Sequence, residues 1–157
     1  MIAPLVQALI AHGDSVFVGP NGDYAAVLET IASTPVTQAR WKPAPTQNSI
    51  WQIVEHLIAS KEWLIETLEH GQAASPVWVE PSGDEAAWQD THARLKEAHQ
   101  RLKLRLEQLS DADLLKVSDP EGHTLLELIL SAGPAHEAHH SGQIDYLRGL
   151  QAEAADM

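Results

Sequence analysis

The sequence predicts an all-α protein, folded as a four-helix bundle. Apolar residues recur every three or four positions through four long stretches, which is the spacing of one face of an α-helix. Connectors rich in proline separate these stretches, and no segment shows the alternation of apolar and polar residues that is typical of a half-buried strand. Amphipathic helices with no sheet to cover bury their apolar faces against one another, and a bundle is the arrangement that does so.

Local signals bound the four helical regions. The first region, residues 2–33, is interrupted near the turn-forming sequence Gly19-Pro20-Asn21-Gly22, with helix expected over residues 2–11. The second region should end near Gly71. Capping-box spacing marks the starts of the other three regions, in the pairs Ser49 and Gln52, Ser82 and Glu85, and Thr124 and Glu127. Two connectors are expected, at residues 34–48 and 71–83.

The last helical region contains a proline and a group of histidines. Pro134 cannot donate a backbone hydrogen bond to the carbonyl of Leu130, and its ring clashes there, so we expect a kink or a break. Directly afterwards, His136 and His140 are four residues apart and lie one above the other on the apolar face of the helix. His139 also shares a face with His136 and is therefore the rival of His140.

Buried imidazole rings need partners for their polar nitrogens. A metal ion meets this need, because one nitrogen of each ring binds the ion and the other donates to a neighbouring group. The alternatives are solvated histidines on a surface helix and core histidines bonded to side chains. The chain has no cysteine, so a metal would be held by histidine nitrogen or carboxylate oxygen, which favours zinc, nickel, iron, manganese or copper.

A third ligand would have to come from another helix, because two histidines do not make a metal site. His56 lies on the second helical region, which in a bundle would face the last one. A lone histidine at such a position is more often structural, but a histidine pair that lacks a third ligand changes this balance. His92, on the apolar face of the third region, is the reserve candidate, and His99 falls off that face.

Composition bounds the class of protein. A chain of 157 residues suits one domain with a sizeable core, which we place at residues 1–150, followed by a short tail at 151–157. The net charge of −12 argues against a nucleic-acid-binding surface. No apolar run approaches the roughly 20 residues that span a bilayer, and no signal peptide is recognisable. We therefore expect a cytoplasmic protein with no nucleic-acid or membrane partner.

Two segments have a recognisable pattern. One is Trp41-Lys42-Pro43-Ala44-Pro45, leading into Val54-Glu55-His56-Leu57, and the other is His136-Glu137-Ala138-His139-His140-Ser141-Gly142-Gln143-Ile144. Together they resemble the DinB-like superfamily, which includes thiol S-transferases that use bacillithiol or mycothiol. The capped start of the last helix at Thr124 fits this resemblance as well.

The resemblance implies an up-down-down-up bundle, frequent homodimers and a divalent metal on three histidines, which correspond here to His56, His136 and His140. Zinc or nickel is the favoured ion, with iron and manganese as alternatives. Ser141 stands where the family usually has arginine, which affects a local salt bridge or a substrate contact rather than the metal. Gly133-Pro134 is a second departure from the family's pattern. A homodimer is also favoured by an apparent excess of tryptophans, namely Trp51, Trp63, Trp78 and Trp88.

Three neutral histidine ligands would leave coordination positions for water or for a thiol. One hypothesis is a metal-dependent enzyme acting on a small-molecule substrate, either a hydrolase or an S-transferase or isomerase that uses a low-molecular-weight thiol. The other is a non-catalytic metal-binding protein associated with stress or damage. A general base near the metal would distinguish them, and four carboxylates are candidates: Glu55, Glu127, Glu137 and Asp145.

Overall fold

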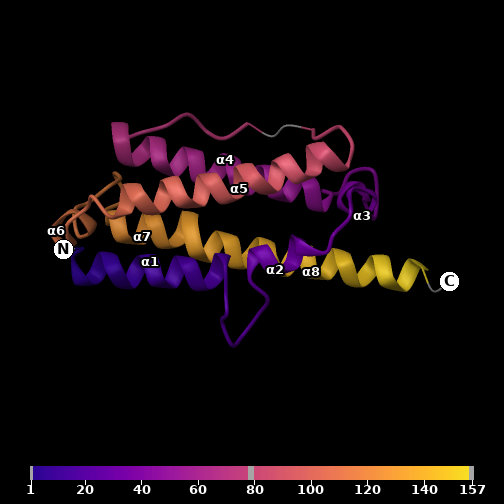
Figure 1. The fold of residues 1–157 in the computed structure, drawn as a ribbon. Coiled ribbons are helices and arrows are strands. Elements are labelled where there is room, and N and C mark those ends of the chain that lie inside the picture. Colours follow the sequence, from indigo (N-terminus) through magenta and orange to yellow (C-terminus); the bar gives the residue numbers. More distant parts are fainter. Residues whose placement is uncertain (1, 78–79, 156–157) are drawn as a thin grey trace.

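The computed structural model describes residues 2–77 and 80–155, and no strand occurs in these ranges. The long elements of the bundle are α1 (Pro4–Phe17), α4 (Ile50–His70), α5 (Glu85–Leu106), and α7 (Leu125–Leu130) with α8 (His136–Ala155), which the π-helical turn η1 (Ser131–Ala135) joins into one rod (Figure 1). Short helices lie in the connections, at α2 (Val27–Ala32), α3 (Val36–Arg40) and α6 (Asp111–Leu114). The all-α prediction is confirmed.

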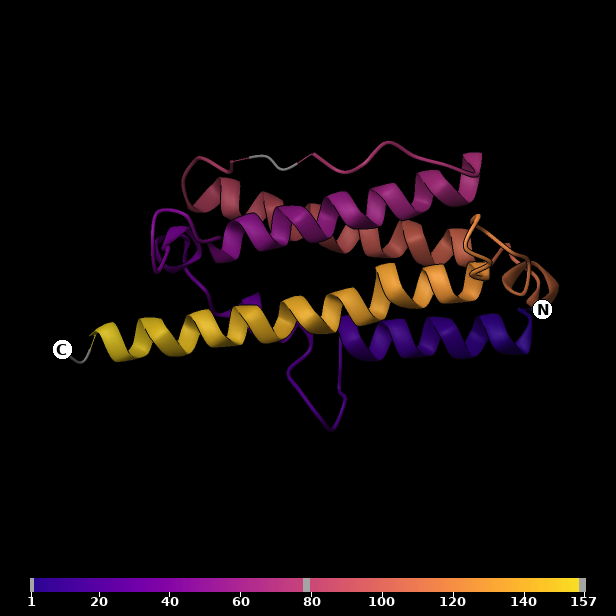
Figure 2. The same ribbon diagram turned by 180° about the vertical axis from the view of Figure 1, so that it is seen from behind.

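The long helices run lengthwise along the bundle. α1 and α8 run in one direction, and α4 and α5 run in the other (Figures 1 and 2). The rod formed by α7, η1 and α8 extends the length of the bundle, with α1 beside its first half and α2 packed against α8. α4 packs against both α5 and α8. None of the described helices combines the length and apolarity needed to cross a membrane.

Two tryptophans lie at the centre of the core rather than on a surface that could pair with another copy. Trp51 is 2% exposed and Trp88 is fully buried. The Trp51 Nε1–H donates to Thr91 Oγ1 at 2.9 Å and the Trp88 Nε1–H donates to the carbonyl of Thr34 at 2.7 Å, so their polar atoms are satisfied within the chain. Trp78 lies outside the described residues. The homodimer stays a prediction, without the support of these two side chains.

Most helix ends follow the expected signals. The capping boxes at Ser49 and Thr124 are formed, and Gly71 ends α4 with φ of 79°, a left-handed conformation that favours glycine. The prediction for Ser82 is wrong, because Asp84 caps α5 by accepting from two backbone N–H groups. α1 also continues through Gly13 to Phe17, beyond the expected end, because its last turn buries Val16 and Phe17 in the core.

The proline in the last helix widens one turn without breaking the rod. Gly133 and Pro134 are both buried inside η1. A π-helical turn has more room than an α-turn, and the wider turn accommodates the proline ring, which lacks an N–H and would clash with the carbonyl four residues earlier. Of the expected kink or break, the break does not occur: a π-helical turn forms at the proline instead, and α8 continues from η1 to Ala155 with the histidines in its first two turns.

Candidate metal centre

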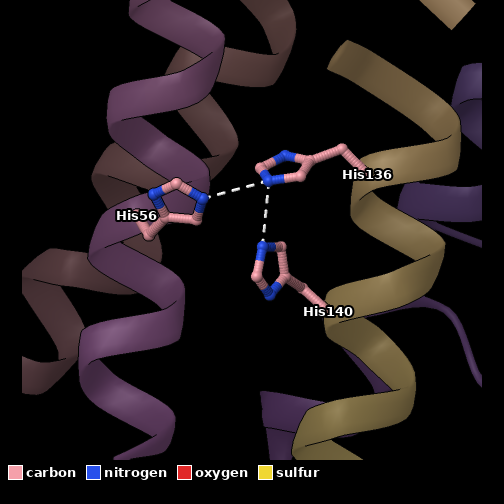
Figure 3. A group of neighbouring side chains, drawn as sticks. All are labelled: His56, His136 and His140. Carbon is pink, nitrogen blue, oxygen red and sulfur yellow. Dashed lines mark hydrogen bonds between the residues drawn. The ribbon is translucent and has the colours of Figure 1, made fainter. Parts of the chain in front are cut away.

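Three histidines from two facing helices converge on one point. His56 comes from the first half of α4, and His136 and His140 come from the start of α8 (Figure 3). The Nε2 atom of His136 lies 3.0 Å from Nε2 of His56 and 2.9 Å from Nε2 of His140. One nitrogen of each ring lies within 4.8 Å of the others. These are the three residues that the sequence favours as ligands, and their spacing follows from the four-residue step on α8.

Hydrogen bonding between these rings cannot satisfy all three nitrogens. His140 Nδ1 lies 2.6 Å from Oε1 of Gln143. Because a carbonyl oxygen only accepts, Nδ1 must carry the proton and Nε2 of His140 presents a lone pair to His136. His136 Nε2 can donate to one neighbour at most, yet it has two. A cation that accepts all three lone pairs removes this conflict, and nitrogens about 2.1 Å from one ion are separated by about 3.0 Å at right angles and about 3.4 Å in a tetrahedron.

The electrostatic environment keeps these rings neutral. Burial lowers the pKa of His56 from 6.5 to about 4, and repulsion from His140 adds to the effect. Burial likewise lowers the pKa of His140 to about 4, against the hydrogen bond to Gln143, which acts in the opposite direction. The pKa of His136 is lowered by burial and then by His56. Neutral imidazole is the form that binds a metal, so the residues present fit a divalent cation.

The outer contacts of the two α8 histidines differ. Gln143 orients His140 by accepting its Nδ1–H. His136 Nδ1 is buried and has no hydrogen-bond partner among the described residues, so none of their side chains orients this ring from behind. Gln143 was not singled out from the sequence, although its position three residues after His140, on the same helical face, is the signal that could have identified it.

The rival histidines lie elsewhere. His139 is exposed, and its Nε2 lies 3.1 Å from the amide nitrogen of Gln143, outside the cluster. His92 packs edge-on against Trp88, with ring centroids 4.2 Å apart. His99 is hydrogen-bonded to Asp14, with Nε2 2.9 Å from Oδ1. The structure therefore brings His140, rather than His139, to His56 and His136.

The four candidate general bases are engaged in other contacts. Glu55 accepts hydrogen bonds from Arg94, Thr91 and Trp51 on the α5 side of α4. Glu127 belongs to the capping box of Thr124. The other two are in ion pairs, Glu137 with Lys61 and Asp145 with Arg148. In the part of the chain that the structure describes, no carboxylate joins the three histidines.

A second group of potential ligands was not expected from the sequence. Asp119, Glu121 and His123 lie close together in the loop before α7. His123 Nδ1 is 2.7 Å from Asp119 Oδ2, and the ion pair raises the pKa of His123. Glu121 and His123 are exposed, so this group is adequately explained as a solvated surface pair.

Comparison with known proteins agrees with the fold. The family model described as the DinB superfamily matches residues 22–144, which include all three clustered histidines. The crystal structure of a DinB-like protein, YjoA, from Bacillus subtilis is similar, with a TM-score of 0.67, 22% sequence identity and 92% of each chain covered. No curated protein matches the chain. The family model covers most of the sequence, and the chain belongs to the DinB superfamily.

Proposed function

We propose that this protein binds one divalent metal ion through the Nε2 atoms of His56, His136 and His140. The observation that carries the proposal is the convergence of three neutral, partly buried imidazole nitrogens that cannot satisfy one another by hydrogen bonding. An all-nitrogen set of neutral ligands favours zinc or nickel, with iron and manganese as alternatives.

We further propose that the protein is a metal-dependent enzyme acting on a small molecule. When bound, a divalent ion lowers the pKa of an adjacent water or thiol, so that either becomes a nucleophile at neutral pH. The three histidines are neutral and leave the charge of such an ion uncompensated, which favours an anionic partner such as a hydroxide or a thiolate. This supports a hydrolase, or an S-transferase or isomerase that uses a low-molecular-weight thiol.

A groove beside the cluster offers room for a small molecule. It has a volume of about 440 Å³ and lies between the start of α4, the connector before it and α8. Its lining residues include no aspartate, glutamate, lysine or arginine, although the chain contains 22 acidic residues. The lining residues of the groove include Gln143, which orients His140. A neutral polar substrate in this groove would be one side chain away from the histidine cluster.

The alternative is a non-catalytic metal-binding protein. It is favoured by one observation, namely that Glu55, Glu127, Glu137 and Asp145 are all engaged in contacts away from the cluster. An enzyme of the proposed kind would therefore rely on the nucleophile itself rather than on a carboxylate base of the protein.

Metal analysis of single variants tests the metal site. Replacing His56, His136 or His140 by alanine should remove the metal that copurifies with the wild-type chain, as measured by inductively coupled plasma mass spectrometry. The matched control is His139→Ala, on the same helix, which should retain it. Loss of metal from His139→Ala with retention in His140→Ala would contradict the ligand assignment. Retention in all four variants would contradict the metal site itself.

A further inference from the structure

A buried ion pair joins the two helices that carry the histidines. The ammonium of Lys61 on α4 contacts Oε1 of Glu137 on α8, and the two side chains are only 3% and 4% exposed. Glu137 directly follows His136, and Lys61 lies five residues after His56. The ion pair therefore connects the same two helices as the cluster, about one turn away from it.

Other helices hold Lys61 in place. Its ammonium lies 3.1 Å from Nδ1 of His99 on α5 and 4.5 Å from the centre of the Phe17 ring on α1. His99 in turn stacks on Phe17, with ring centroids 3.9 Å apart, and bonds to Asp14. α1, α4, α5 and α8 thus meet around one ammonium group, so its position is set by the whole bundle.

A buried ion pair is a contact between two helices that carries a large desolvation cost. Taking two charges out of water costs several kcal/mol per ion, and a well-packed apolar pair is often as stable or more stable. Only one oxygen of Glu137 contacts Lys61, namely Oε1, whereas Oε2 is buried without a hydrogen-bond partner in the part of the chain that the structure describes. Glu137 also borders a cavity of about 30 Å³ that an apolar side chain could fill. Stability alone therefore does not account for the pair.

An ion pair does specify position. Buried ionic groups fix the register of helices in some proteins, because a charged group that slides away from its partner is left unpaired, whereas apolar side chains can repack. His136 depends on such a constraint more than His140 does, because within residues 2–77 and 80–155 its Nδ1 has no acceptor, whereas Gln143 orients His140. The position of His136 follows from its backbone, which emerges from the irregular turn η1 and is anchored one residue later by Glu137.

We propose that Lys61 and Glu137 are positioning residues for the metal centre. Their ion pair sets the register of α8 against α4, and with it the position of His136 relative to His56. This inference rests on the metal binding proposed above.

The test replaces the pair by apolar residues of similar size. The double variant Lys61→Met/Glu137→Leu should keep the urea midpoint of the metal-free protein at or above that of wild type. Its affinity for Zn²⁺, measured by competition with a chelator, should fall by about tenfold or more, the range typical of groups that support metal ligands. The matched control is Glu62→Gln/Arg101→Met, which removes an exposed ion pair between α4 and α5. It should leave the affinity within about twofold.

A second variant tests the same proposal if the double variant does not fold. Glu137→Asp keeps both charges but withdraws the carboxylate by one methylene, and it should weaken Zn²⁺ binding and alter the visible absorption spectrum of bound Co²⁺. Wild-type affinity and an unchanged Co²⁺ spectrum in folded variants would overturn the positioning role while leaving the metal site intact. A wild-type chain that binds no Zn²⁺ would overturn both.

Discussion

Gln143 offers a sharp test of how the centre is organised. Its Oε1 accepts from Nδ1 of His140 at 2.6 Å, which holds the proton on Nδ1 and leaves Nε2 free to bind a metal. Gln143→Leu removes this acceptor, so His140 can rotate and adopt either tautomer. Loss of such a supporting contact typically lowers metal affinity by about 10- to 100-fold, which corresponds to about 1.4–2.7 kcal/mol.

The side chain is exposed, so the change should act on the centre and not on the fold. Zn²⁺ affinity would be measured by competition with a chelator, and the urea midpoint of the metal-free protein should remain that of wild type. Gln143→Glu keeps an acceptor for Nδ1 and should keep the affinity within a few-fold. Gln151→Leu is the control on the same helix, since it removes an amide that donates to the carbonyl of Gln38 at 2.8 Å, away from the histidines. Equal affinities for the leucine and glutamate variants at position 143 would refute the argument.

Four other outcomes follow from the structure. Since burial lowers the pKa of His56 and His140 to about 4, the unfolded chain binds protons between about pH 6.5 and pH 4 that the folded metal-free chain does not. The free energy of unfolding of the metal-free protein, followed by urea midpoints, should therefore fall as the pH falls through this window. The fall should be less steep in His56→Ala. Unperturbed histidines would lose Zn²⁺ below about pH 6, whereas these buried histidines should retain it to about pH 5. Complete loss of Zn²⁺ at pH 6 would argue against neutral buried rings. Pro134→Ala restores a backbone N–H within η1, so it should keep the helix content seen by circular dichroism but weaken Zn²⁺ binding by displacing His136. Leu64→Ala truncates a fully buried side chain and should lower the free energy of unfolding by about 2–5 kcal/mol, measured by urea titration.

The sequence predicted those features that depend on neighbouring residues. Helix starts at Ser49 and Thr124 need only a capping side chain and a partner three residues later. The stacking of His136 and His140 needs only the helical repeat. Asp84 and Ser82 are both competent caps close together, so local chemistry could not choose between them; Glu85, the partner that Ser82 would need, instead accepts from the backbone N–H of Val36.

Contacts between residues far apart in the sequence could not be predicted from neighbouring residues. Lys61 lies beside a run of charged residues, and such runs normally form a solvated face. Its burial depends on Glu137, 76 positions later in the chain. The contacts of the candidate bases could not be predicted for the same reason: Glu55 is adjacent to His56 in sequence, but its carboxylate pairs with Arg94 on α5.

The π-helical turn changes the rotation of α8 about its axis relative to α7. A wide turn acts as a phase shift in the repeat, because it contains an additional residue compared with an α-helix of the same rise. A helical wheel drawn continuously from Leu125 to Ala155 would therefore misplace by about 100° the side chains on one side of η1. Deletion of a single residue within 131–135 should turn the whole of α8 about its axis and carry its histidines away from α4, whereas the same deletion near Ala155 should leave them in place.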